Sequence, residues 1–197
     1  MGPVSPLGRR RLLGLLEVAG FVAVALWALR DSFGEAVGEG IDLWGTIWFH
    51  HWILDCVRSW TSPGWTAAFY HPEGFALFAQ TGNNFLDALV AAPLLAALGS
   101  PGHMVPFTAL VLVGNALAMR VLLGSLGLSR TAAFAGAVIY GFHPFVMHEL
   151  AGGRPTQALL WFWPLALKGL LEVEEDSPVW AAGLAGVFLG LQGWTYW

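Results

Sequence analysis

The sequence contains very little cysteine and very little charge, and each shortage excludes a class of protein. Cys56 is the only cysteine among the 197 residues, so an internal disulfide and a thiolate metal cluster are both excluded. Only 11% of the residues are charged, and the net charge is -4 at pH 7. The few basic residues stand at the ends of apolar segments and form no patch, so we expect no nucleic-acid partner.

Motifs of the common soluble enzymes are also missing. The chain has no phosphate-binding P-loop, no Gly-x-Ser-x-Gly nucleophile turn, no His-Glu-x-x-His zinc helix and no Gly-x-Gly-x-x-Gly dinucleotide loop. No internal repeat period stands out. Soluble-enzyme chemistry therefore has no support in the sequence.

The chain is instead rich in apolar sequence. Hydrophobic residues make up 56% of it and the mean hydropathy is +0.62, whereas globular domains average about 45–50% apolar and about 25% charged residues. The eleven tryptophans favour the headgroup level of a membrane, where an apolar ring and an N–H group are both satisfied. A lipid bilayer is the natural solvent for such a chain.

Five apolar runs have about the length that an α-helix needs to cross a bilayer. They are residues 12–29, 104–124, 131–148, 156–171 and 178–197. The run 85–98 is shorter and contains Asp87 and Pro93, so we expect an interfacial or re-entrant helix there. The sequence thus predicts an all-α fold, a single membrane domain formed by a polytopic transmembrane helical bundle.

Basic residues predict how these helices are oriented. Arg9–Arg11 precede the first run, and Arg120 and Arg130 flank the connection between the second and third, so all should face the cytoplasm. The first run could be a signal peptide, but Glu17 within it and the lack of a clear cleavage site favour a retained anchor. Residues 31–103 then form one large extracytoplasmic loop.

The loop collects most of the polar side chains. Its segment 42–57, DLWGTIWFHHWILDCV, spaces its apolar residues like a helix that lies along the membrane surface. Asp42 begins this helix, either as its N-cap or as a carboxylate displayed at the mouth of a site.

Two further parts of the loop carry candidate binding residues. In the sequence FYHPEG, proline and glycine favour a turn that presents His71 and Glu73. Asn83, Asn84 and Asp87 stand at the start of the interfacial helix. They either cap this helix or bind the hydroxyl groups of a sugar.

A second polar segment is predicted on the same face of the membrane. His148, Arg154 and Gln157 flank a Gly-Gly-Arg-Pro turn. The guanidinium of Arg154 either holds a phosphate, helped by the free N–H groups of the following helix, or snorkels to lipid headgroups. His143 and His148 would lie roughly 140° apart around a helix, a poor arrangement for a metal, so no metal ligand is assigned.

The order of these features resembles the membrane glycosyltransferases of the GT-C superfamily. In the bacterial members, the first outer loop opens with Gly-Asp before a Trp-containing helix and continues to a Tyr-Pro-x-Gly-like turn. A later span ends in a Ser-Pro-like step, followed by Gly-His-x-Gln and an apolar Pro-Leu helix. The matching pieces here are Asp42–Trp48, Tyr70–Gly74, His143–Pro144, Gly153–Gln157 and Pro164–Leu165, and the resemblance covers most of residues 10–197.

Two departures from this pattern matter. Ile41 separates Gly40 from Asp42, which leaves the catalytic acid open between Asp42, Glu39 and Asp55. The Gly-His-x-Gln step is replaced by Gly-Arg-Pro-Thr-Gln.

The resemblance implies a multi-pass protein of a bacterial inner membrane that transfers a sugar from a polyprenyl-phosphate donor to an acceptor at the extracytoplasmic face. Asp42 would be the base or would bind a divalent cation, Mg²⁺ or Mn²⁺, and Arg154 would steady the leaving phosphate. The residues implied in substrate binding are His71, Glu73, Asn83, Asn84, His148 and Gln157, besides Arg154. Because the superfamily has more spans than five, we expect the N-terminal part of a longer protein, and the implied partners are the bilayer and the lipid-linked donor.

Two other classes of function fit parts of the sequence. A transporter or lipid-carrier flippase would also use amphipathic outer helices, but such proteins place ionisable residues near the bilayer midplane and show repeated halves. Here Glu17 is the only acid predicted in mid-span, and no halves repeat. A structural membrane subunit would dock a partner through the tryptophans of residues 44–65, which a headgroup belt explains equally well.

Overall fold

The computed structural model describes residues 6–80, 84–173 and 178–195, which are all-α apart from one short hairpin. The helices are α1 Pro6–Ala28, α2 Ile41–Ser59, α3 Leu77–Gln80, α4 Phe85–Leu98, α5 Met104–Ser125, α6 Arg130–Gly141, α7 Pro144–Ala151, α8 Pro155–Ala158, α9 Phe162–Glu172 and α10 Pro178–Gly193, with a 3-10 turn at Arg30–Ser32. Strand β1, Trp65–Thr66, pairs antiparallel with β2, Phe75–Ala76.

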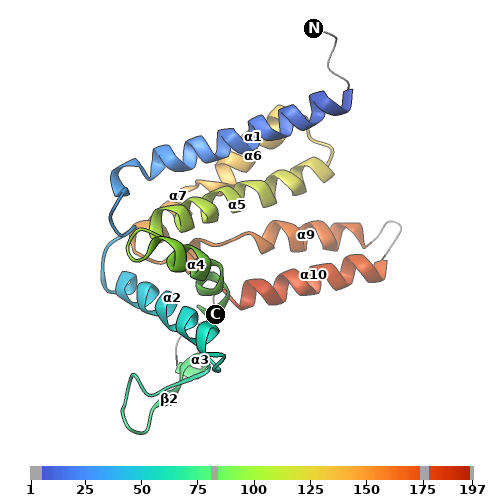
Figure 1. The fold of residues 1–197 in the computed structure, drawn as a ribbon. Helices are drawn as coiled ribbons and strands as arrows, with labels where there is room; N and C mark the ends of the chain where they lie inside the picture. Colours follow the sequence, from blue (N-terminus) through green and yellow to red (C-terminus); the bar gives the residue numbers. More distant parts are fainter. Residues whose placement is uncertain (1–5, 81–83, 174–177, 196–197) are drawn as a thin grey trace.

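Helix α5 is the centre of the bundle. It contacts α1, α6 and α9, and α10 packs on α9. Figure 1 shows these five helices running side by side, while α2, α4 and the hairpin gather at one end of them. The main core lies where α1, α5, α6 and α7 meet, with Phe21, Phe107 and Leu112 fully buried.

Two helices of the described chain are long and apolar enough to cross a membrane: residues 11–28 of α1, and α5. Half of the α5 window is buried inside the protein, but only 11% of the α1 window is. An apolar helix that is exposed on nearly all sides favours a lipid surrounding over water. These helices therefore favour membrane association, and the position of α1 fits both an anchor and a signal peptide.

The run 131–148 was expected to form one helix, but it is interrupted at residues 142–143 between α6 and α7. The cause is Pro144, which has no N–H group and forces the residue before it out of the helical conformation. His143 accordingly has an extended backbone, with φ -70° and ψ 162°.

The run 156–171 is interrupted too, at residues 159–161 between α8 and α9. Here the side chain of Asn115 on α5 replaces the missing helical hydrogen bonds: its Nδ2 donates to Ala158 O, and its Oδ1 accepts from Leu160 N, both at 2.8 Å. Gln192 Nε2 on α10 donates to Leu159 O at 2.8 Å. The backbone groups freed by the break are thus paired inside an apolar environment, as they must be where water is absent.

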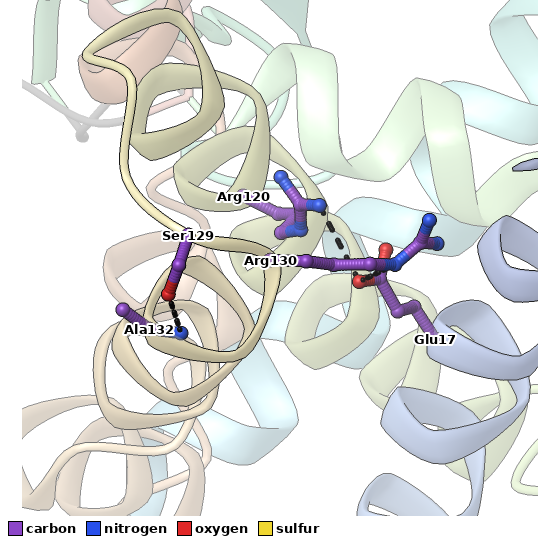
Figure 2. A network of polar contacts seen from close by, with 5 residues as sticks. All are labelled: Glu17, Arg120, Ser129, Arg130 and Ala132. Atoms are coloured by element: carbon purple, nitrogen blue, oxygen red, sulfur yellow. Dashed lines mark hydrogen bonds and ion pairs between the residues drawn. The ribbon is translucent and has the colours of Figure 1, made fainter.

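Glu17, predicted as a lone acid within an apolar run, is paired. Its Oε1 accepts from Arg130 Nε at 2.8 Å and from Arg120 Nη2 at 3.3 Å, and so links α1 to α5 and α6 (Figure 2). In the same corner, Ser129 Oγ caps α6 by accepting from Ala132 N at 3.3 Å. The pairing explains how the carboxylate is tolerated in α1.

Helices α5 and α6 lie close together at Gly141. A Cβ added there would lie 2.9 Å from Ala116 Cβ and 3.0 Å from Ala116 N, distances that require the backbone to move. A Cβ at Gly186 in α10 would meet no atom within 4 Å.

We therefore predict opposite effects for one substitution at two helical glycines. Gly186→Ala should stabilise the protein by about 0.5–1 kcal/mol, because alanine favours the helix. Gly141→Ala should destabilise it by about 1–3 kcal/mol, because it overpacks the α5–α6 contact. Thermal unfolding in detergent measures both, and a melting temperature raised equally by the two changes would contradict the close approach.

Candidate functional site

An open cavity of about 1070 Å³ lies between α2, the hairpin and the segment that follows α7. Its aromatic wall consists of Trp44, Trp48, Phe49, Phe69, Tyr70 and Phe75. Its polar lining consists of Asp42, Thr46, Asn84, Arg154, Thr156 and Gln157. A large concave site with mostly apolar walls and a few converging polar groups is the usual form of a small-molecule site.

Arg154 is the central charge of this cavity. Its Nε donates to Glu149 Oε2 at 2.6 Å and its Nη1 to Asp42 Oδ2 at 3.3 Å. These two hydrogen bonds, the one to Glu149 first, raise the pKa of the guanidinium above its ordinary value. Glu149 is nearly inaccessible, with 8% of its side chain exposed, whereas 53% of Asp42 is exposed toward the cavity and solvent.

Asp42 is not the N-cap of its helix. Helix α2 begins at Ile41 and its N-cap is Gly40, so Asp42 lies in the first turn. A carboxylate is favourable there, because the N-terminal end of a helix carries partial positive charge. The side chain is therefore free to reach Arg154. The interpretation of Asp42 as a carboxylate displayed at the mouth of a site requires this freedom.

Two glycines allow the start of α2 to lie close to the turn after α7 that carries Arg154. Gly153 has φ +70°, and a Cβ on it would lie 2.6 Å from Leu43 Cβ. Gly38 has φ +99° and lies against the backbone of Leu150 and Gly153. Thr46 Oγ1 also donates to Gly153 O at 2.9 Å, so the start of α2 is fastened to the turn that carries Arg154.

The three acids left open by the sequence are now distinguished by position. Asp42 lines the cavity, whereas Glu39 and Asp55 are exposed and do not. Glu39 contributes only its backbone N–H, which donates to Ala151 O at 2.8 Å. Asp42 is therefore the one acid of the three that can act inside this cavity.

Of the other predicted site residues, Asn84 and Gln157 line the cavity beside Arg154. His71 and Glu73 are exposed in the hairpin turn, and His148 is exposed on α7; none of the three lines it. Asn83 lies outside the described residues. Asn84 occupies the N-cap position of α4 without a side-chain capping hydrogen bond, so the capping alternative has no contact to support it.

Glu149 and the aromatic wall were absent from the predicted site. Trp44 and Trp48 are four residues apart and follow Ile41 at helical spacing, so the sequence does signal one aromatic face of α2. It does not reveal that the hairpin brings Phe69 and Tyr70 opposite that face. For Glu149, the five-residue separation from Arg154 carries no helical signal, because a turn intervenes.

The donor set does not fit a divalent cation. Asp42 and Glu149 both direct their oxygens to the guanidinium of Arg154, which occupies the position between them. Mg²⁺ and Mn²⁺ require several oxygen ligands, and here only two carboxylates converge, both of them paired with the guanidinium. Among the described residues no group of three or more His, Cys, Asp or Glu side chains is arranged to hold a metal ion.

A buried polar cluster supports α2 on the side away from the cavity. His50 on α2, His103 before α5 and Asp87 on α4 are all fully buried. His50 Nδ1 lies 2.9 Å from His103 Nε2, and His50 Nε2 lies 4.0 Å from Asp87 Oδ2. Burial lowers the pKa of His50 to about 3 and also lowers that of His103, and it raises the pKa of Asp87 to about 8.

No family model, curated protein or solved structure matches this chain.

The buried cluster predicts an unusual loss of stability with rising pH. The unfolded chain releases the Asp87 proton near pH 3.8 and the folded chain near 8, so the folded state loses stability as the pH rises between these values. Below 6.5 the two histidines have the opposite effect, because their folded-state pKa values are lowered. From about pH 6.5 to 8 Asp87 alone acts, at a cost on the order of 2 kcal/mol.

Melting temperatures measured between pH 6.5 and 8 test this expectation. The wild-type value should fall over this interval, and Asp87→Asn, a neutral side chain of the same shape, should remove the fall. Asp55→Asn, on the exposed side of α2, is the control and should keep it. A profile for Asp87→Asn that parallels the wild type would contradict the raised pKa.

Proposed function

We propose that this chain acts in sugar transfer of the GT-C type, from a polyprenyl-phosphate-linked donor to an acceptor at the extracytoplasmic face of a bacterial inner membrane. The observation that carries the proposal is the pair formed by Asp42 and Arg154, 3.3 Å apart in one aromatic-walled cavity. Transfer from a lipid phosphate needs both of these groups: a base for the acceptor and a positive charge for the leaving group.

Each residue has a defined part in the reaction. The Asp42 carboxylate takes the proton of the acceptor hydroxyl, whose oxygen attacks the anomeric carbon. The bond from that carbon to the phosphate oxygen breaks, and the phosphate departs with the electron pair. Arg154 pairs with the negative charge that develops on it.

The contacts of Arg154 support an ordered exchange of partners. Glu149 holds its Nε from the buried side, and Asp42 holds its Nη1 from the open side. A donor phosphate entering the cavity would replace Asp42 on the guanidinium. The carboxylate would thereby be released to act as a base at the time when substrate is bound.

The remaining lining suits a sugar. The apolar face of a sugar ring packs on aromatic rings such as those of Trp44, Trp48 and Tyr70. The amides of Asn84 and Gln157 offer donors and acceptors to its hydroxyl groups.

The proposal includes five membrane crossings, of which α1 and α5 are long and apolar enough by themselves. At 1.5 Å per residue, α6 and α7 together span about 30 Å, close to the thickness of a hydrocarbon core. A broken helix is tolerated within the membrane when neighbouring side chains form hydrogen bonds with its unpaired backbone N–H and C=O groups. Asn115 and Gln192 do this at the break between α8 and α9.

Asp42→Asn should lower the rate of sugar transfer about 10²–10⁴-fold, because a general base contributes a factor of this size. The rate is measured in liposomes as polyprenyl phosphate released from a panel of polyprenyl-phosphate-linked hexoses and pentoses. Glu39→Gln and Asp55→Asn, which remove acids outside the cavity, are the controls and should keep the wild-type rate. Unchanged turnover in Asp42→Asn would remove this residue from the mechanism.

Cysteine labelling from either side of the membrane tests the proposed orientation. In a Cys56→Ala background, Ser62→Cys just before the hairpin and Ala151→Cys at the end of α7 should react with an impermeant maleimide added outside. Leu128→Cys, between α5 and α6, should react only after the membrane is opened. If Ser62→Cys and Ala151→Cys reacted from opposite sides, the shared site would be disproved.

A further inference from the structure

A second charged cluster lies far from the cavity, between the middle of α1, the last part of α5 and the start of α6. It consists of Glu17, Arg120 and Arg130 (Figure 2). Arg120 lies sixteen residues beyond the start of α5, which corresponds to about 24 Å along the helix. The proposed sugar transfer does not use this cluster.

The cluster carries more positive than negative charge. Both guanidinium groups bond to one oxygen, Oε1 of Glu17, and within the described ranges neither has a second carboxylate within 4.0 Å. Two arginines against one glutamate leave a net charge of +1. This excess is unusual between apolar helices, where a charge is normally matched by a partner.

Part of the hydrogen-bonding capacity of the arginines is also unused. Arg120 Nε is buried and has no hydrogen-bond partner among the described residues. Arg130 keeps 37% of its side chain exposed, and its terminal nitrogens point away from the Glu17 oxygen that its Nε contacts (Figure 2). Buried guanidinium N–H groups without partners are costly, so an anionic ligand would be stabilising here.

The surface beside the cluster is apolar. Val18, Val22 and Leu26, which follow Glu17 on α1, are each more than a third exposed, and Val121 next to Arg120 is 47% exposed. An inorganic phosphate has no apolar group that could contact this surface. A phospholipid does, because its acyl chains lie against apolar helix faces while its phosphate meets basic residues at the headgroup level.

We infer that Arg120 and Arg130 bind the phosphate of an anionic phospholipid whose acyl chains lie along Val18, Val22 and Leu26 on the exposed face of α1. Glu17 pairs with one nitrogen of each guanidinium group and so competes with the phosphate for the two arginines. The inference requires α1 and α5 to lie in a bilayer, but it does not depend on sugar transfer.

Binding of phosphatidylglycerol to the whole chain in phosphatidylcholine nanodiscs tests this site, with retained lipid counted by native mass spectrometry. The double variant Arg120→Gln/Arg130→Gln should bind phosphatidylglycerol at least about tenfold more weakly than the wild type, since it loses charge-assisted hydrogen bonds. Lys168→Gln is the matched control, because Lys168 is a cation of α9 paired with Glu172 at 2.5 Å, and should bind as the wild type does.

The variant Glu17→Gln distinguishes a cluster that binds a lipid from one that only links α1 to α5 and α6. It removes the competing carboxylate and keeps both arginines, so phosphatidylglycerol should bind as tightly as in the wild type or more tightly. Equal losses in Glu17→Gln and in the double variant would mean that the cluster only fastens helices, and would overturn the inference. So would unchanged binding in the double variant.

Glycerol phosphate added to pure phosphatidylcholine nanodiscs distinguishes the two sources of the anion. It should not raise the melting temperature, whereas phosphatidylglycerol in the nanodisc should. An equal rise with glycerol phosphate would identify a soluble phosphate ligand and overturn the assignment to lipid. Sugar transfer by the double variant should be retained, so that failure here and failure of the Asp42 mechanism can be told apart.

Discussion

The structure depends on one constraint: the backbone groups freed where its helices break must be paired within an apolar bundle. Asn115 meets this constraint at the break between α8 and α9, by donating to Ala158 O and accepting from Leu160 N. The break ends the short helix α8, which follows Arg154. Asn115, in the middle of α5, thus fastens to the bundle the segment that continues from the cationic residue of the cavity.

The charges of the bundle form two clusters with opposite composition. Around Arg154 two carboxylates share one guanidinium, and around Glu17 two guanidinium groups share one carboxylate oxygen. The first cluster has an acid to spare and the second has a cation to spare. In a low-dielectric environment such imbalance is costly unless something compensates for it. Each cluster is therefore suited to exchanging one partner for a ligand.

The sequence was sufficient to predict the helices whose positions depend on hydrophobic periodicity and length. The expected helices 42–57, 85–98 and 104–124 correspond to α2, α4 and α5 within two residues at each end. Pro144 breaks the run 131–148 locally, whereas Asn115 and Gln192 stabilise the break in the run 156–171 through tertiary contacts. Periodicity alone missed both breaks. The same holds for the cavity: charge counting brought Asp42 and Arg154 to one face, but their direct contact depends on packing between residues more than a hundred positions apart.

Gly153 has a consequence for comparing this chain with its relatives. Any side chain there would meet both the strain of a positive φ and the backbone of Leu43 at under 3 Å. A related protein with another residue at this position would have to hold α2 farther from the turn, and its acid and arginine would not meet. Glycine at position 153 is thus a marker, readable in a sequence alone, for relatives that can assemble the same pair.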